Sequence, residues 1–229
     1  MKKLIALLIG VCPFGMLRIF LWRLLFNYKI SYSSKIGWGN CIYCNRVEIV
    51  NGRIGYLNRI SCNELVIDNA EIGRLNLIKL LNCLHLNKGS LVNSNNSLIG
   101  LYRENEEYKY KNDCNITLGC NSLITVRHEF DATRAIKIGD NVVFGGKDTQ
   151  IWTHGFDTDR NMVTGGVFIG DDVYIGSRCT ITQGVKICDK TIVGAATCVS
   201  KSIDVTGFYV SNELIRKSDF KIYEKSDYE

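Results

Sequence analysis

The sequence predicts an all-β solenoid, in which short parallel strands coil around a triangular core. The first observation is a run of aliphatic residues near the C-terminus that recurs every six positions without a slip, at Ile169, Ile175, Ile181, Ile187, Val193 and Val199. A period of six fits neither a 3.6-residue helix nor the two-residue alternation of an ordinary strand. It fits a prism in which each side is one short strand and one turn.

The second observation is a repeat of 18 residues far upstream, which is three such hexads and therefore one full coil. Isoleucine followed by glycine recurs at Ile36, Ile54 and Ile72. We expect the next side of the prism to hold Ile42, Ile60 and Ile78, and the third side to hold Val66 and Leu84, with an interruption at Glu48. One coil cannot bury its own aliphatic residues, but stacked coils can. Residues 32–204 are thus predicted to form one β-helix domain.

Composition agrees with this fold and excludes one class of partner. With one proline in 229 residues, the chain reversals must come from glycine, asparagine, aspartate and serine, which crowd the gaps between the aliphatic positions. The formal charge of +5 is spread without a long basic run, so we expect no nucleic-acid partner. Between the two clean repeat blocks, residues 102–114 are polar and charged, which predicts an excursion from the wall or a solvated loop.

Residues 1–31 are predicted to form two short amphipathic helices joined by a turn at 12–15. The apolar run from Leu4 to Leu17 is shorter than the roughly 20 residues that span a bilayer. It resembles the apolar part of a signal peptide, but no small-x-small cleavage site follows it. Two interpretations of residues 1–28 stay open, a cap on the end of the solenoid and a helix pair lying on a membrane surface, and both can hold at once.

The ten cysteines are interpreted as reduced thiols rather than disulfides. Four of them fall among aliphatic positions and are expected to be small buried hydrophobes: Cys62, Cys83, Cys179 and Cys198. The pair Cys41-x-x-Cys44 supplies two of the four ligands that structural zinc requires, so no metal is expected. This usage favours a cytoplasmic protein, with a peripheral position on the inner face of the membrane left open.

Five motifs between residues 136 and 203 follow one another in a characteristic order: 138–142 (Ile-Gly-Asp-Asn-Val), 152–154 (Trp-Thr-His), 169–176 (Ile-Gly-Asp-Asp-Val-Tyr-Ile-Gly), 193–196 (Val-Gly-Ala-Ala) and 199–201 (Val-Ser-Lys). In this order they resemble the hexapeptide-repeat acyltransferases, and most closely the sugar O-acetyltransferases found with surface-polysaccharide synthesis. The resemblance covers residues 36–204. It implies a left-handed β-helix, a hand that the six-residue period does not itself determine.

The resemblance implies that His154 is the catalytic base. Acyl transfer from a thioester to a sugar hydroxyl requires removal of a proton, and histidine suits that task near neutral pH. Asp157 stands at the family's spacing from it, and Trp152 precedes it by two residues. Both are candidates for orienting the imidazole or for binding the acceptor.

A second titratable cluster contains His128 and Asp131. Its separation from His154 along the chain allows proximity in a solenoid, so these residues could contact the acceptor or orient His154. A solvated turn is an equal alternative. His85 lies among aliphatic residues and is interpreted as structural.

The resemblance also implies a homotrimer with acetyl-coenzyme A bound between adjacent subunits. Small residues that let a ligand approach the backbone lie at the matching positions: Gly176, Ser177, Gly194, Ala195 and Ala196. Tyr174 is expected to pack on the pantetheine arm, and Lys201 to lie near the nucleotide phosphates. The final segment, 205–229, lacks the proline-containing sequence usual in the family, so its path is left open.

The predicted function is therefore transfer of an acetyl group from acetyl-coenzyme A to a sugar hydroxyl, on a surface polysaccharide or its precursor. Two alternatives remain. A metal-dependent carbonic anhydrase can share this fold, but it requires three histidine ligands, and this chain has three histidines with none at short ligand spacing. The other is a non-catalytic scaffold, against which the retention of His154 with the small residues argues.

Overall fold

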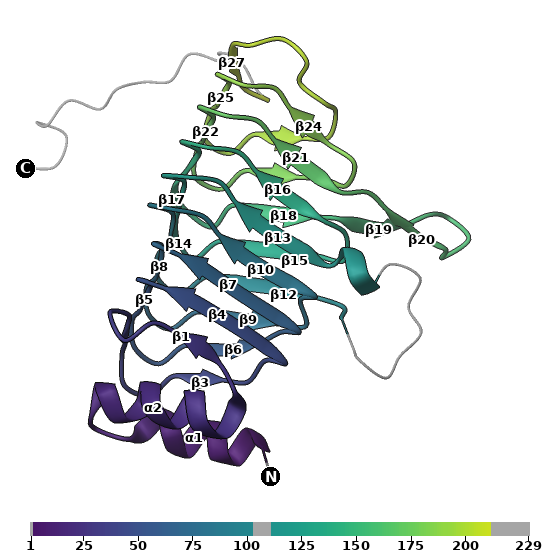
Figure 1. Cartoon of the computed structure of the whole chain (residues 1–229). Coiled ribbons are helices and arrows are strands. Elements are labelled where there is room, and N and C mark those ends of the chain that lie inside the picture. Colours follow the sequence, from purple (N-terminus) through teal and green to yellow (C-terminus); the bar gives the residue numbers. More distant parts are fainter. Residues whose placement is uncertain (1, 103–110, 212–229) are drawn as a thin grey trace, which may run out of the picture.

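The computed structural model describes residues 2–102 and 111–211 as a triangular prism with two helices across one end (Figure 1). Three parallel sheets form the walls, and one antiparallel hairpin projects from them. The predicted parallel β-helix with short N-terminal helices is confirmed. Most of the predicted polar excursion, 103–110, and the tail from 212 to 229 lie outside the described residues.

Each wall takes one strand from each successive coil. The first sheet contains β1 (Lys29–Ile30), β4 (Arg46–Val50), β7 (Glu64–Asp68), β10 (Cys83–Leu86), β13 (Asn115–Leu118), β16 (Ile136–Ile138), β21 (Val167–Ile169) and β24 (Lys186–Ile187). The second contains β2 (Lys35–Ile36), β5 (Arg53–Ile54), β8 (Glu71–Ile72), β11 (Leu91–Val92), β14 (Leu123–Val126), β17 (Val143–Lys147), β22 (Tyr174–Ile175), β25 (Ile192–Val193) and β27 (Phe208–Tyr209). The third contains β3 (Cys41–Ile42), β6 (Arg59–Ser61), β9 (Leu77–Lys79), β12 (Ser97–Gly100), β15 (Glu129–Ala132), β18 (Gln150–Trp152), β23 (Thr180–Ile181) and β26 (Cys198–Val199). Strand hydrogen bonds therefore run along the prism axis.

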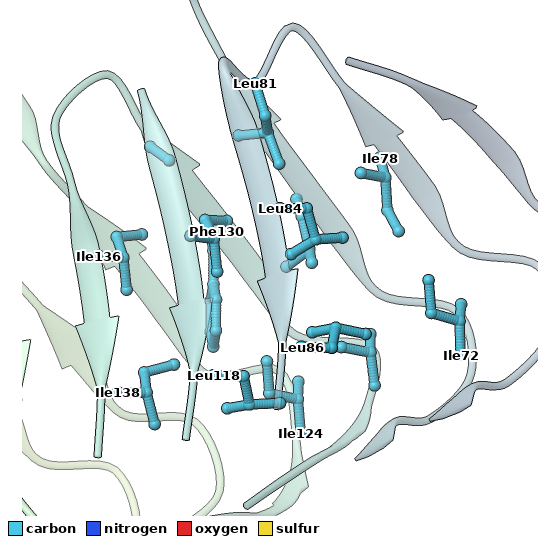
Figure 2. Packing of buried hydrophobic residues seen from close by; sticks show 14 of the residues in the cluster. Ile72, Ile78, Leu81, Leu84, Leu86, Leu118, Ile124, Phe130, Ile136 and Ile138 are labelled. Carbon is cyan, nitrogen blue, oxygen red and sulfur yellow. The ribbon is translucent and has the colours of Figure 1, made fainter. Parts of the chain in front are cut away.

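The core is a column of aliphatic side chains, one or two from each strand. Ile42, Ile60 and Ile78 are fully buried on the third wall, as the repeat predicts. Figure 2 shows Leu84 and Phe130 directed into the same interior. Stacked strands lie about 4.8 Å apart, so each inward side chain contacts its counterparts in the coils on either side.

On the first wall the predicted register is wrong by one residue. Val66 pairs with Glu48 and His85 on the outer face, whereas Leu65 is buried beside Leu84. This coil is one residue longer than the repeat, as the 19-residue interval between the hydrogen-bonded Asn63 and Asn82 shows. Counting back 18 from Leu84 therefore selects an outward position.

Two coils carry larger insertions, and both leave the wall at the same corner. The chain leaves the wall after β12 and returns to it through the 3₁₀ turn η1 (Lys111–Asp113). It leaves again after β18 for the hairpin of β19 (His154–Phe156) and β20 (Met162–Thr164). Strands β12 and β18 both belong to the third sheet, and each departure falls where the chain would turn toward the first. Figure 1 shows the hairpin as an arm standing away from the prism.

Helices α1 (Lys2–Val11) and α2 (Gly15–Phe26) close the open end of the first coil. Ile19 and Trp22 are buried against the prism, and the Arg18 guanidinium donates to the carbonyl oxygen of Ile36 at 2.7 Å. At Gly10 the helix approaches so closely that a Cβ atom would collide with the carbonyl of Asn40. In the part of the chain that the structure describes, no helix has the length and apolar character needed to cross a membrane.

The cysteines divide between the two faces of the walls. Cys62 and Cys179 are buried as expected, but Cys83 is half-buried and Cys198 is exposed. The prediction fails for the last two because strand side chains alternate, and the neighbouring residues Leu84 and Val199 take the inward positions.

Candidate functional site

The corner from which the hairpin departs brings His154 to Asp131. Asp131 faces outward from β15, and His154 is the first residue of β19, where the chain leaves the wall. The imidazole Nδ1 lies 3.0 Å from the carboxylate Oδ1 of Asp131. The two side chains are 23% and 18% exposed, so the pair is partly shielded and still open to solvent.

Thr133 fixes which nitrogen of His154 carries the hydrogen. The Thr133 hydroxyl donates to Oδ1 of Asp131 at 2.9 Å, and the same Oγ1 lies 3.2 Å from Nδ1 of His154. A carboxylate only accepts, so the hydroxyl hydrogen points to Asp131 and the lone pairs face Nδ1. Both neighbours of Nδ1 are therefore acceptors, which places the hydrogen on Nδ1 and a lone pair on Nε2. The Nε2 atom makes no hydrogen bond to any residue that the structure describes.

A further layer of hydrogen bonds holds this arrangement. The buried Thr153 hydroxyl donates to the backbone oxygen of Asp131 at 2.8 Å and accepts from the backbone N–H of Arg134 at 2.9 Å. The Arg134 guanidinium contacts Asp113 at 2.6 Å and the Thr164 hydroxyl at 3.3 Å, which ties the two insertions together. Sequence reasoning missed both Thr133 and Arg134. The available signal was their place in the polar run that begins at Asp131.

The two neighbours predicted for His154 lie in different places. Asp157 is fully exposed near the tip of the hairpin, where its carboxylate accepts from the backbone N–H groups of Asn161 at 2.8 Å and Asp159 at 2.9 Å. Hydrogen bonds from Asn161 hold its pKa below the usual range. The structure thus gives Asp157 the role of shaping the turn. Trp152 pairs in register with Asp131 on the outer face of the third sheet, so it lies beside the carboxylate.

His128 lies inside the prism, in a column of hydrogen-bonding side chains at the corner between the second and third sheets. We call this column the side-chain ladder; its members are Asn40, Asn58, Asn76, Asn96, His128, Thr149 and Cys179. At each step a side-chain atom accepts from the backbone N–H of the next member, at distances from 2.8 to 3.2 Å. The ladder satisfies backbone groups that the turns leave unpaired.

Both ring nitrogens of His128 are engaged in this ladder. Nδ1 accepts from the N–H of Thr149 at 3.1 Å, so the hydrogen is on Nε2, which lies 2.8 Å from the Thr125 hydroxyl. The side chain is 1% exposed, and burial lowers its pKa from 6.5 to about 4. The solvated-turn alternative is therefore wrong, and so is the grouping of His128 with Asp131: its ring faces the core and Asp131 faces outward.

The residues expected to hold coenzyme A form two stacked corners between the second and third sheets. Gly176 donates its N–H to Val193 at 2.8 Å, and Ala196 donates to Ser177 at 2.8 Å, so the turns containing Gly176–Ser177 and Gly194–Ala196 lie one above the other. A Cβ atom at Gly176 would lie 2.6 Å from the backbone nitrogen of Ala195, which only glycine avoids.

Tyr174 stands beside these corners on the outer face of the second sheet, 45% exposed. Its ring lies over Gly145 of β17, where a side chain would collide with the phenol. Sequence reasoning did not include Gly145. Its signal was the Gly145-Gly146 pair, because adjacent glycines in a repeat of strands indicate a close approach.

Lys201 and His154 share one corner, and the small-residue turns occupy another. Lys201 is exposed just after β26, and His154 follows β18 at the same ends of the third-sheet strands. Gly176 and Gly194 precede β23 and β26, at the opposite ends. Within one chain the structure therefore does not bring the predicted base to the predicted coenzyme A turns.

The three histidines do not converge. His85 is on the outer face of the first sheet, His128 is inside the prism, and His154 is at the hairpin corner. Within residues 2–102 and 111–211, no group of three or more His, Cys, Asp or Glu side chains has the arrangement of a metal site. This placement does not favour the carbonic anhydrase alternative, which requires three histidines on one ion.

Comparison with known proteins places the fold. No family model matches the sequence. A curated protein of Bacillus subtilis (strain 168), named "Putative acetyltransferase YvoF", is 37% identical over 79 residues. That match covers 34% of this chain and 45% of YvoF, which is less than half of the relative's length.

Among solved structures, the polySia-specific acetyltransferase NeuO matches with a TM-score of 0.56 at 16% identity, over 87% of this chain and 85% of that one. A hexapeptide-repeat-containing acetyltransferase of Vibrio cholerae O1 biovar eltor, VCA0836, crystallised with acetyl-coenzyme A, gives a TM-score of 0.36 at 19% identity, over 87% and 74%. The likeness to NeuO confirms, at the level of fold, the predicted resemblance to the hexapeptide-repeat acyltransferases.

Proposed function

We propose that this chain is an O-acetyltransferase that moves an acetyl group from acetyl-coenzyme A to a sugar hydroxyl, with a surface polysaccharide or its precursor as the acceptor class. One observation carries the proposal: the Asp131–His154 contact of 3.0 Å, with Thr133 as the second acceptor, leaves a basic Nε2 open to solvent. The names of YvoF and NeuO support the reaction class, and the polySia specificity of NeuO supports a sugar acceptor.

The reaction requires one base and no covalent enzyme intermediate. Nε2 of His154 accepts the hydroxyl proton while the sugar oxygen attacks the thioester carbonyl. The tetrahedral intermediate then expels the coenzyme A thiolate, which receives the same proton from the imidazolium. The ester and the free thiol are the products. Asp131 stabilises the imidazolium and holds the ring in the tautomer that can act.

The coenzyme A turns support a site shared between subunits. The turns with Gly176 and Gly194, with the ring of Tyr174 beside them, lie at one corner of the prism, and His154 lies at another. In the proposed homotrimer, His154 of one subunit meets these turns of its neighbour, and Lys201 meets the nucleotide phosphates. The single-chain alternative, in which each chain works alone, leaves the thioester a full strand away from the base.

The first experiment tests the reaction. Purified full-length protein is incubated with acetyl-coenzyme A and a panel of mono- and oligosaccharides, and both free thiol and acetylated product are measured. We expect acetylation of at least one carbohydrate. Coenzyme A binding without transfer to any acceptor would favour the scaffold, and carbon dioxide hydration that depends on added zinc would favour the carbonic anhydrase.

The second experiment tests the shared site by complementation. His154→Ala removes the base, and Ala195→Trp fills the exposed small-residue turn. Each variant alone should be inactive, but co-expressed chains should form mixed trimers in which some sites combine an intact base with an intact turn. Recovered activity supports the shared site. A monomer mass in sedimentation, or no recovery in mixed oligomers, contradicts it.

A further inference from the structure

The helical cap leaves a large part of its apolar surface uncovered by the prism. Eleven large apolar side chains on it are exposed: Leu4, Ile5, Leu7, Leu8, Val11, Phe14, Met16, Leu17, Phe20, Leu24 and Leu25. We call this set the cap face. Ala6, Ile9, Ile19 and Trp22 are buried on the opposite side. Helices α1 and α2 thus use one apolar side to close the solenoid and leave a second one uncovered, more than a soluble surface usually shows.

The charge of the chain is concentrated at the same end. Residues 1–47 hold seven of the 28 Lys and Arg residues and none of the 23 Asp and Glu residues. The other 182 residues therefore have 21 cationic and 23 acidic side chains, a net −2, although the whole chain is +5. Lys2, Lys3, Arg23, Lys29 and Lys35 are exposed around the cap. Residues 1–47 are therefore net positive, and Glu48 of β4 lies beside Arg23 and Lys29 at the border of this region.

Aromatic residues border the cap face. Trp38 is 47% exposed, and its Nε1–H donates to the carbonyl of Val11 at 2.8 Å, which fixes the indole at the edge of α1. Tyr32 is 52% exposed beneath the guanidinium of Arg23, with the cation 4.5 Å from the ring centre. Rings with one apolar and one polar edge favour the boundary between lipid and water.

A groove between α1 and the third sheet adds a place for a headgroup. Its volume is about 730 Å³, and it opens to solvent beside Lys3, Leu4 and Leu7. Arg59 and Lys79 line its other wall, and no acidic residue lines it. The three cationic side chains suit a lipid phosphate, and the apolar side chains Leu4 and Leu7 suit its acyl chain.

From these observations we propose that the cap face docks on the surface of an anionic lipid bilayer. The apolar side chains enter the boundary between headgroups and acyl chains, and the surrounding cations meet lipid phosphates. Helices of 10 and 12 residues are too short to span, so they lie in the plane of the surface. A second copy of this chain is a poorer occupant, because two cap faces in contact would oppose the same positive charges.

Vesicle sedimentation of the full chain tests this docking. We expect at least about tenfold stronger binding to phosphatidylcholine vesicles that contain phosphatidylglycerol than to phosphatidylcholine alone, and weaker binding as sodium chloride rises from about 0.1 to about 0.5 M. Equal binding to both vesicles, or binding to neither, would overturn the proposal.

Matched variants locate the surface. Leu4→Ser with Leu8→Ser changes side chains that are 61% and 59% exposed, and should lower vesicle binding roughly tenfold or more. Val205→Ser with Phe208→Ser changes side chains that are each 68% exposed at the far end, and should leave it unchanged. A second variant, Lys2→Gln with Lys3→Gln, should weaken binding only to the anionic vesicles.

Two results would contradict the assignment. One is equal loss of binding in the cap variant and the far-end variant. The other is a cap variant that changes the oligomeric state while the unaltered chain ignores vesicles, which would make the cap face a contact between copies. Circular dichroism melting confirms that each variant is folded.

Discussion

His128 and His154 flank adjacent strands of the third sheet, β15 and β18, yet their surroundings differ in every respect that matters to an imidazole. His128 is 1% exposed, accepts through Nδ1 and has a pKa lowered to about 4. His154 donates through Nδ1 to a carboxylate, and its Nε2 makes no hydrogen bond to any residue that the structure describes. The ladder keeps one histidine neutral as a spacer between coils, whereas the hairpin corner equips the other as a base.

The largest effect should follow from removing the outer histidine. His154→Ala should lower turnover by roughly 10² to 10⁴, because no other histidine lies at this corner to accept the hydroxyl proton. The melting temperature should change little, since the side chain is partly exposed. His85→Ala is the matched control and should keep its activity. Near-normal turnover of His154→Ala, measured as acetylated product, would refute the assignment.

Removing the inner histidine should act on stability instead. His128→Ala leaves the buried N–H of Thr149 without its acceptor and opens a cavity, so the free energy of unfolding should fall by about 2–4 kcal/mol. His128→Asn supplies an acceptor like the four asparagines below it and should lose less. Denaturant titration measures both. If the two variants are equally destabilised, the hydrogen-bonding role is incorrect.

Asp131→Asn should show whether Asp131 orients His154 without contributing to the stability of the fold. An amide can offer its NH₂ to Nδ1, which favours the tautomer with the hydrogen on Nε2 and removes the base. Turnover should fall roughly tenfold or more, with a changed pH–rate profile and unchanged thermal stability. Asp68→Asn, on an exposed part of the first wall, is the control. An unaltered pH–rate profile would leave Asp131 without a positioning role.

The smallest expected effect is a pH dependence of stability. The folded pKa of His128 lies below its ordinary 6.5, so the unfolded state binds more protons between pH 6.5 and 4. The contribution is fully present above pH 6.5 and is lost as the pH falls toward 4, by about 1 kcal/mol at pH 5.5. His128→Asn should remove this slope in denaturant titrations at several pH values. A slope that persists in the variant would come from other groups.

The repeat made most of the fold predictable because burial imposes it on every coil. Ile42, Ile60 and Ile78 must point inward whatever the turns do. Position along the coil was less predictable, since one extra residue between Leu65 and Leu84 shifts the count and exchanges the two faces. Part of the side-chain ladder is visible in the sequence, as the 18-residue spacing of Asn40, Asn58 and Asn76. The rest could not be predicted, because hydrogen bonds between coils produce no pattern of hydrophobic residues.

The site was predictable in its residues more than in its contacts. Motif order selected His154, and the polar cluster selected Asp131, but their pairing depends on two insertions that leave the wall at one corner. Spacing along the chain favoured Asp157 as a neighbour of the base. The hairpin instead carries Asp157 out to its turn, because an antiparallel pair extends away from a parallel wall.

Because the strands stack at an even spacing, the number of coils below a residue sets its position along the prism axis. Asp131 lies on β15, four strand steps above β3, the lowest strand of the third sheet. At about 4.8 Å per step, the carboxylate of Asp131 lies roughly 19 Å from β3 along the prism axis. Coils are added or lost as whole units, so this distance can change in evolution only by the spacing of one strand. The distance along the prism axis from the helical end to the site can therefore change only in steps of about 4.8 Å. A chain with one more coil below the site would hold it about 4.8 Å farther from the helices, without altering the corner that holds its histidine.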